Sequence, residues 1–152
     1  MITIDKFNEL TSKLIGQPLT QVSDSYGDVF VLHFGNLNNY THPKLSHLKQ
    51  GDYELVIKMS KCGLICVRNY SELKQVKIDC LLNQTLQHIG LEEDLQLTLA
   101  FKNDVDNFTD LDIIPDDNET ELPYWELWIP GDNYIVADST GLQLLDKHSY
   151  VA

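Results

Sequence analysis

Long hydrophobic runs, cysteines and basic residues are all scarce in this sequence. No stretch approaches the roughly 18 uninterrupted apolar residues that suggest a membrane-spanning helix. The amino terminus lacks the basic segment and apolar run of a secretory signal. The three cysteines, at positions 62, 66 and 80, cannot all pair with one another. These absences together predict a reduced, cytoplasmic protein.

Positive charge is low, with 11 Lys and Arg residues against 23 Asp and Glu residues and a net charge of −12. This balance disfavours nucleic acid, whose phosphates need Lys and Arg, and it also disfavours anionic membrane surfaces. The length of 152 residues and the 43% hydrophobic content are ordinary for one globular domain. We therefore expect a single domain over residues 1–152 that binds neither nucleic acid nor membrane.

Motifs for catalysis and for cofactors are also missing. The five histidines lack metal-ligand spacing such as His-Glu-x-x-His, and Cys62 and Cys66 have no Cys-x-x-Cys spacing and no second pair. No phosphate-binding glycine loop or nucleophile elbow is present. A Cys–His pair formed in space, such as Cys66 with His33, stays open, although inert buried cysteines are far more common. We predict no metal, no cofactor and no enzymatic activity.

An internal repeat is the main feature that the sequence does contain. Residues 14–22 (Leu-Ile-Gly-Gln-Pro-Leu-Thr-Gln-Val) recur as residues 81–89 (Leu-Leu-Asn-Gln-Thr-Leu-Gln-His-Ile). The match continues without a gap, so that the three apolar residues at 30, 32 and 34 align with those at 97, 99 and 101. Further on, residues 53–57 resemble residues 125–129, and residues 65–67 correspond to residues 135–137. We expect two diverged copies, about 4–70 and about 71–140, related by a pseudo-twofold axis.

Each copy is expected to form a helix followed by three or four strands. Apolar spacing predicts a first helix carrying Ile4, Phe7, Leu10 and Leu14, and its counterpart opens at the N-cap Ser71 and carries Leu73, Val76, Cys80 and Leu81. Alternation predicts strands at 29–34, 53–59, 63–68, 95–101, 125–129 and 134–138, with a tight turn at 130–133. The fold class is then α+β, mostly antiparallel sheet, with long polar loops at 35–50 and 103–123.

Nearly all the excess negative charge lies in the second copy. Residues 92–138 contain fourteen acids and one base, whereas residues 1–91 contain eight acids and nine bases. The densest part is the acidic segment 104–121, which has eight acids, no base and several interleaved apolar residues. Acids mixed with apolar anchors are typical of an interface for a basic protein. In the alternative interpretation, the apolar residues form a further core strand and the acids face water.

We predict a partner-binding site formed by this segment and nearby aromatic residues. Its members are Asp104, Asp106, Phe108, Asp110, Asp112, Asp116, Asp117, Glu119, Glu121, Trp128 and Tyr134. The two Asp-x-Asp pairs, at 104/106 and 110/112, suggest calcium. Neither register, however, has the fifth-position oxygen ligand and sixth-position glycine of an EF-hand loop. A cation site of another kind stays open.

The two Tyr/Trp-Glu-Leu strands, at 53–55 and 125–127, and the acidic segment resemble features of small bacterial immunity proteins. Such proteins are the partners of polymorphic or contact-dependent growth-inhibition toxins, and the resemblance covers most of the chain. It implies a cytoplasmic inhibitor that binds a basic toxin domain, for example a nuclease, and masks its active site.

The second hypothesis is a small-ligand-binding or catalytic domain with a pocket between the two copies. Glu54, Glu126 and the histidines would supply its polar groups, and the two glutamates could face each other and share a proton. A simpler interpretation places each glutamate on the solvent side of an alternating strand.

Overall fold

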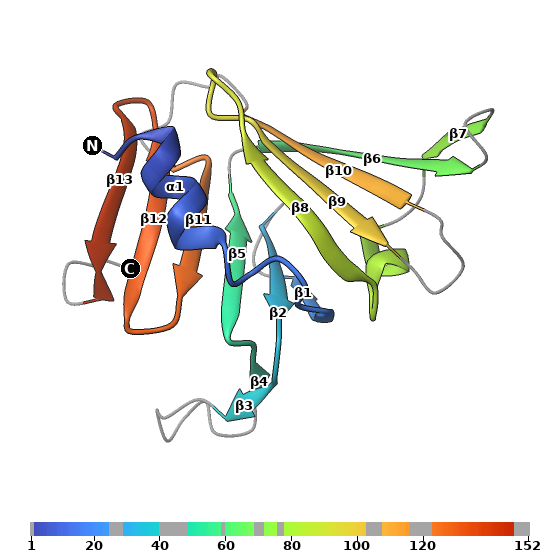
Figure 1. Cartoon of the computed structure of the whole chain (residues 1–152), viewed down its shortest axis with the longest axis horizontal. Helices are drawn as coiled ribbons and strands as arrows, with labels where there is room; N and C mark the ends of the chain where they lie inside the picture. Colours follow the sequence, from blue (N-terminus) through green and yellow to red (C-terminus); the bar gives the residue numbers. More distant parts are fainter. Residues whose placement is uncertain are drawn as a thin grey trace.

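The computed structural model describes residues 2–24, 29–39, 49–58, 60–68, 72–75, 78–102, 108–115 and 123–147. Within these ranges the chain forms the α-helix α1 (Ile4–Thr11), the short 3-10 helix η2 (Ile78–Leu81) and strands β1 to β13 (Figure 1). Every strand pairing is antiparallel. The fold is therefore a single domain of mostly antiparallel sheet with one short helix, compatible with the expected α+β class.

Two large sheets and one two-stranded ribbon contain all these strands. The six-stranded sheet has the order β1 (Leu19–Asp24), β2 (Phe30–Phe34), β5 (Tyr53–Ile57), β11 (Trp125–Ile129), β12 (Asn133–Asp138) and β13 (Gly141–Asp146). The five-stranded sheet has the order β7 (Glu72–Gln75), β6 (Ser60–Arg68), β10 (Phe108–Pro115), β9 (Leu97–Lys102) and β8 (Thr85–Leu91). The ribbon consists of β3 (Asn38–Asn39) and β4 (Lys49–Gln50).

The core combines the helix with one face of each sheet. Alternate residues of β2, β5, β9 and β10, among them Leu32, Leu55, Leu99 and Leu111, are fully buried in one cluster. Helix α1 lies over β11 and β12 in Figure 1 and inserts Phe7 edge-on against Trp125, with 6.1 Å between ring centroids. Burial of each leucine, isoleucine or phenylalanine side chain in this core stabilises the fold by about 1.5–3 kcal/mol relative to leaving it exposed.

The strands cross from one sheet to the other at two places. β1, β2 and β5 are neighbours in the six-stranded sheet, but the next strand, β6, joins the five-stranded sheet beside β10. In the same way β8, β9 and β10 are neighbours in the five-stranded sheet, and β11 then joins the six-stranded sheet beside β5 (Figure 1). Each large sheet thus contains strands from both parts of the chain.

The β1–β2 and β8–β9 hairpins have the same register at corresponding residues. Leu19 pairs with Phe34 in the first and Leu86 with Phe101 in the second, and each ladder is irregular directly after that pair. The two phenylalanine rings stack on each other, with centroids 6.1 Å apart and planes 12° apart.

Reciprocal backbone hydrogen bonds join the segments that lead into these two hairpins. The N–H of Gly16 donates to the carbonyl of Leu86, and that of Asn83 donates to the carbonyl of Leu19, both over 2.7 Å. In turn, Leu19 N–H donates to Gln84 and Leu86 N–H donates to Gln17, both over 2.9 Å. We call residues 16–19 and 83–86 the junction. Gly16 and Asn83 both have a positive φ, of 95° and 68°.

The prediction of a second helix that begins at Ser71 is wrong. Residues 72–75 form the edge strand β7, which pairs with β6, and only residues 78–81 form a helical turn, η2. Two of the residues assigned to that helix, Ser71 and Val76, lie outside the described ranges. The apolar spacing there suits either structure, and pairing with β6 satisfies those backbone polar groups of residues 72–75 that face β6.

The two expected loops also contain strands. Residues 35–50 include both strands of the ribbon, and residues 103–123 include β10, the central strand of the five-stranded sheet. The similar strands at 53–57 and 125–129 are direct antiparallel neighbours, and they occupy different positions in the strand order. The six strands expected from alternation are present, but Val29, Lys58, Leu95 and Gln96 were wrongly assigned to them: Leu95 and Gln96 belong to the turn before β9. Met59 lies outside the described part of the chain.

The left-handed backbone at the junction generates a stability prediction. A Cβ at Gly16 would meet nothing within 4 Å, so Gly16→Ala changes only the conformational energy and should lower the free energy of unfolding by about 1 kcal/mol. Asn83→Gly should cost less than about 0.5 kcal/mol, since glycine suits the same backbone. Urea unfolding measures the stability of both variants. A Gly16→Ala protein as stable as the wild type would contradict the left-handed backbone conformation assigned to Gly16.

Candidate functional site: an acidic groove

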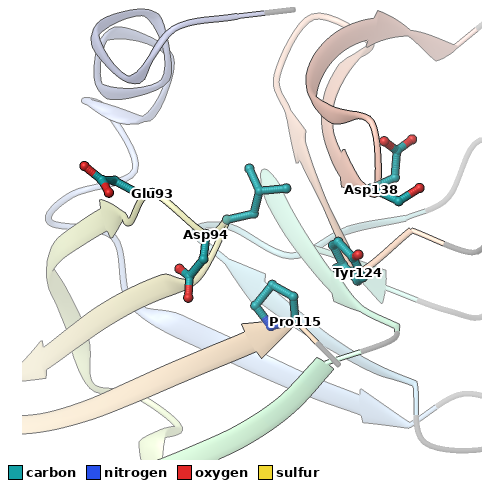
Figure 2. A pocket seen from close by; sticks show the side chains of 7 residues that line it. Glu93, Asp94, Pro115, Tyr124 and Asp138 are labelled. Atoms are coloured by element: carbon teal, nitrogen blue, oxygen red, sulfur yellow. The ribbon is translucent and has the colours of Figure 1, made fainter. Parts of the chain in front are cut away.

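Acidic residues gather around a hollow between two turns. The β8–β9 turn supplies Glu93, Asp94 and Leu95, and Asp138 at the end of β12 lies across from them (Figure 2). Tyr124, Pro115 and Ser139 complete this hollow, whose volume is about 430 Å³. The same turn borders another surface hollow, of about 570 Å³, which is lined by Glu92, Glu93, Asp94 and Gln96.

A second hollow of about 360 Å³ continues from the first and has an apolar floor. Both hollows share Glu93, Leu95 and Ser139. The floor of the second comes from the N-terminal segment and from the edges of both sheets: Ile2, Ile4, Leu91, Leu95 and Leu142. We call these two hollows together the acidic groove. It combines an acidic rim with exposed apolar surface, since Ile4 is 46% exposed.

The β8–β9 turn is held in place by its own hydrogen bonds and by the core. Glu92 N–H donates to the Gln96 carbonyl over 2.9 Å, and Asp94 Oδ1 accepts from Gln96 N–H over 3.2 Å. Leu95 has a φ of 68°, which costs a bulky L-residue about 1–2 kcal/mol. Its carbonyl accepts a hydrogen bond of 2.9 Å from Nε1 of the buried Trp125. The core side chain thereby fixes a strained turn.

The acids of the groove have no basic partner in the part of the chain that the structure describes. Glu92, Glu93 and Asp94 are exposed and Asp138 is half-buried, and no Lys or Arg there lies within ion-pair distance of them. Within the described ranges, Asp138 accepts hydrogen bonds only from the backbone N–H and the hydroxyl of Thr140. Their negative charge is therefore available to an external basic group.

The sequence-predicted site residues lie on two different faces. Phe108, Asp110 and Asp112 project from β10 on the side away from the core, because Thr109, Leu111 and Ile113 of that strand are buried. Trp128 and Tyr134 stack with centroids 4.2 Å apart on the outer face of the six-stranded sheet. The structure therefore does not bring these five residues together, and Asp104, Asp106, Asp116, Asp117, Glu119 and Glu121 lie outside the described residues.

The acidic strand β10 matches the alternative interpretation, in which its apolar residues join the core. Its outer face is nevertheless unusual, because Phe108 is 42% exposed and Ile114 is 40% exposed. Lys102 Nζ lies 5.8 Å from the centroid of the Phe108 ring. Burial raises the pKa of Asp110 above its ordinary value, and the neighbouring carboxylate of Asp112 raises it further.

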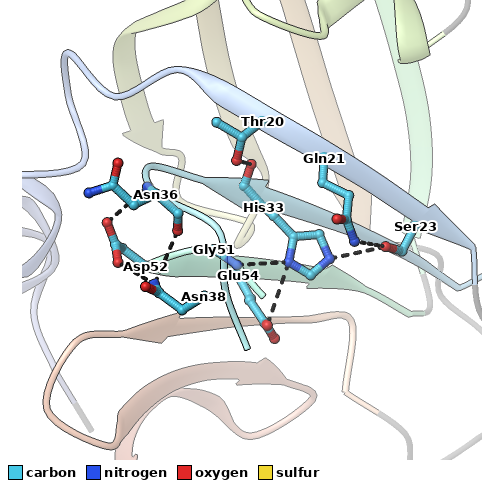
Figure 3. Close-up of polar contacts among 9 residues, drawn as sticks. All are labelled: Thr20, Gln21, Ser23, His33, Asn36, Asn38, Gly51, Asp52 and Glu54. Carbon is cyan, nitrogen blue, oxygen red and sulfur yellow. Dashed lines mark hydrogen bonds and ion pairs between the residues drawn. The ribbon is translucent and has the colours of Figure 1, made fainter. Parts of the chain in front are cut away.

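A buried polar cluster surrounds His33 on the other sheet (Figure 3). His33 Nε2 lies 3.1 Å from Ser23 Oγ, and Nδ1 lies 3.5 Å from Glu54 Oε1. Ser23, His33 and Glu54 thus lie in the order of a catalytic triad, with Ser23 in the place of the nucleophile, His33 of the base and Glu54 of the carboxylate. However, the Gly51 N–H donates to Nδ1 over 3.2 Å, which places the proton of the neutral ring on Nε2. The imidazole then donates to Ser23 and cannot accept its proton.

The two glutamates of the ligand-binding hypothesis have separate partners. Glu126 is only 3% exposed, which overturns its expected solvent position, and its Oε2 accepts from Lys58 Nζ over 3.2 Å. Its Oε1 is buried and has no hydrogen-bond partner among the described residues. Glu54 lies beside His33 instead, so the geometry does not resemble a pair that shares one proton. Neither the two glutamates nor His33 line the acidic groove.

Sequence reasoning missed the groove because it depends on proximity across the fold. The signal that could have drawn attention to it is the run Glu92-Glu93-Asp94, three consecutive acids between two hydrophobic strands. Nothing in the sequence places this run opposite Asp138. Cys66, the residue considered as a partner for His33, belongs to β6 in the other sheet, and its side chain lies outside the described set.

Comparison with known proteins adds no relative, because no family model, curated protein or solved structure matches the chain. Among the described side chains, no group of three or more His, Cys, Asp or Glu residues could hold a metal ion. In the same residues, no helix has the length and apolar character that crossing a membrane requires.

The His33 cluster generates a pH prediction. Burial lowers the pKa of His33 below its ordinary value of 6.5, so the unfolded chain binds the proton more readily than the folded one. The free energy of unfolding should fall as the pH drops below about 6.5, until the lower folded pKa is passed. Urea unfolding across this range should show a shallower decline for His33→Asn than for the wild type. Identical slopes for the two proteins would rule out this role for His33.

Proposed function

We propose that this chain is an acidic protein-binding inhibitor, an immunity protein that neutralises a basic toxin domain by masking its active site. A nuclease is one toxin class with a suitably basic cleft. The observation that carries the proposal is the acidic groove, in which carboxylates that have no basic partner among the described residues border an apolar floor. The resemblance to immunity proteins points the same way, and the unequal charge of the two halves adds to it.

The physical argument rests on complementarity. Like charges crowded on the β8–β9 turn repel one another, and a basic surface would relieve that repulsion. Long-range attraction between opposite charges speeds the encounter, whereas buried apolar contacts slow the dissociation. The groove offers both within one surface, since Glu93 stands on the rim and Leu95 on the floor. The outer face of β10, with its two exposed apolar side chains, is an additional acidic surface.

We further infer that the chain consists of two diverged copies related by a pseudo-twofold axis through the junction. The reciprocal hydrogen bonds support this, because exchanging the two segments maps each bond onto its counterpart. The isolated bridge between Pro18 and Thr85 pairs two corresponding residues directly. The strand orders also correspond, with β1, β2, β5, β6 and β7 in the places of β8, β9, β10, β11 and β12. In this correspondence residues 53–57 match β10, and not residues 125–129 as their sequence suggests, and residues 65–67 match β11, and not residues 135–137.

This correspondence shows where the copies differ chemically. Register places Ala100 where the first copy has His33, and Gly90 where it has Ser23. The polar cluster therefore belongs to the first copy alone. The exposed carboxylates of the β8–β9 turn belong to the second copy, which supports a binding role specific to that half.

The proposal predicts that reversing one charge on the groove slows binding to the natural partner. The tagged chain would be used to capture that partner from the native cell, and the identified partner would then be purified. At low ionic strength, Glu93→Lys should reduce the association rate by about ten-fold because it opposes electrostatic steering. Stopped-flow measurements at several salt concentrations should show a steep decline for the wild type and a shallower one for the variant.

Glu9→Lys is the matched control, since it changes the charge equally on an exposed helix position outside the groove. It should bind nearly as fast as the wild type. The partner's own activity, such as nucleic acid cleavage, should be blocked by the wild-type chain. An active partner in the saturated complex, or association that is indifferent to salt and to Glu93→Lys, would refute the proposal.

A further inference from the structure

We infer that the acidic groove recognises an extended basic segment of the partner protein by seating one apolar side chain between Ile4, Leu91 and Leu95. This inference rests on the proposed function and specifies the chemistry that the groove selects. Lys or Arg residues on either side of the apolar one would meet the carboxylates of the rim. The selected feature is thus a combination of charge and one apolar anchor, and charge alone would not suffice.

The size and composition of the second hollow suit a side chain. Its volume of about 360 Å³ lies near the lower end of the range for small-molecule pockets, about 300–1,000 Å³. Its floor is formed by aliphatic residues, one of which, Ile4, is nearly half exposed at the start of α1. The neighbouring Ile2 is held against the sheet edge, because its N–H donates to the Leu142 carbonyl over 3.0 Å. The floor is therefore a fixed part of the fold.

The backbone at Leu95 provides a second reason to assign binding to this floor. Glycine or asparagine would adopt its positive φ at lower cost, yet the position holds a large aliphatic residue. Strained residues persist where the surrounding structure fixes them, and they cluster at binding sites. Here the hydrogen bond from Trp125 fixes the turn, and the side chain of Leu95 lines both hollows.

Charge complementarity identifies the occupant. The rim of the apolar hollow carries Glu92 and Glu93, and Asp94 and Asp138 line the adjoining hollow. Among the residues that the structure describes, no Lys or Arg lines either hollow. An acidic or purely apolar segment would leave these carboxylates unpaired or repelled, whereas a basic segment supplies opposite charges at both ends of the groove.

The test uses two synthetic probe peptides with the whole chain. The first is acetyl-Lys-Arg-Phe-Arg-Lys-amide, and the second replaces its phenylalanine with serine, so that both peptides carry the same charge. Each is titrated into isotopically labelled protein, and NMR follows the methyl groups of Ile4, Leu91 and Leu95 in the groove and of Ile114 on the outer face of β10. The phenylalanine peptide should shift these methyl signals and bind at least about five-fold more tightly than the serine peptide, because it buries apolar surface.

Two variants test whether the preference for the phenylalanine peptide over the serine peptide arises at the apolar floor. Ile4→Ser removes part of that floor, so the two affinities should differ by less than about two-fold. Ile15→Ser is the matched control, since Ile15 is 44% exposed and lies outside the groove. It should keep the full preference. Leu95→Asn relieves the strain of the left-handed backbone, which offsets the loss of Leu95 packing against the core. This variant should therefore unfold near the urea concentration of the wild type but bind the two peptides about equally.

Three results would overturn the inference. These are equal binding of the two peptides, methyl shifts confined to the outer face of β10, or an unchanged preference in both Ile4→Ser and Leu95→Asn. The proposed function is tested separately, because the salt dependence and inhibition measured with the natural partner do not depend on an apolar anchor. A partner inhibited in a Glu93-dependent way, without a peptide preference, would preserve the function and reject the anchor.

Discussion

Four backbone hydrogen bonds across the junction are the constraint on which the rest of the structure depends. They connect residues 16–19 to residues 83–86, where the chain enters the β1–β2 and β8–β9 hairpins. Because each segment donates to the other, both must turn sharply there, and Gly16 and Asn83 adopt positive φ values. The contact also places Phe34 against Phe101 in the core. Strands β6 and β11 then cross between the sheets, so neither sheet is complete without the other half of the chain.

This arrangement lets one scaffold carry two chemically different surfaces. On the outer face of the six-stranded sheet, polar groups are buried and paired, as with His33 and the Gly51 amide or Glu126 and Lys58. In the acidic groove, by contrast, carboxylates are exposed and have no basic partner among the described residues. An unpaired charge is costly when it is buried. At the rim of the groove, water solvates the carboxylates, so they can stay unpaired until a partner binds. The Trp125 side chain links the groove to the core through the Leu95 carbonyl.

The strands were largely predictable from sequence, because alternating burial leaves a direct mark on the order of residues. This holds for β5, where Tyr53, Leu55 and Ile57 are buried and the two residues between them are half-buried. The segment 72–81 misled the helix prediction, since its apolar spacing fits both a helix and an edge strand followed by a turn. The concentration of acids was visible from composition. The placement of these acids on two surfaces, the β10 face and the groove, could not be predicted. It depends on which strands pair and on where the β12–β13 turn lies.

Hydrogen exchange of the whole chain, alone and saturated with its natural partner, tests the central claim most directly. The amides of Glu93 and Asp94 make none of the turn's backbone hydrogen bonds, so they should exchange quickly in the free chain. The account predicts that the partner slows exchange at these two amides and at residues 139–140, while residues 36–39 keep their free rates. Protection of the ribbon or of the Trp128–Tyr134 face, with an unchanged β8–β9 turn, would contradict it.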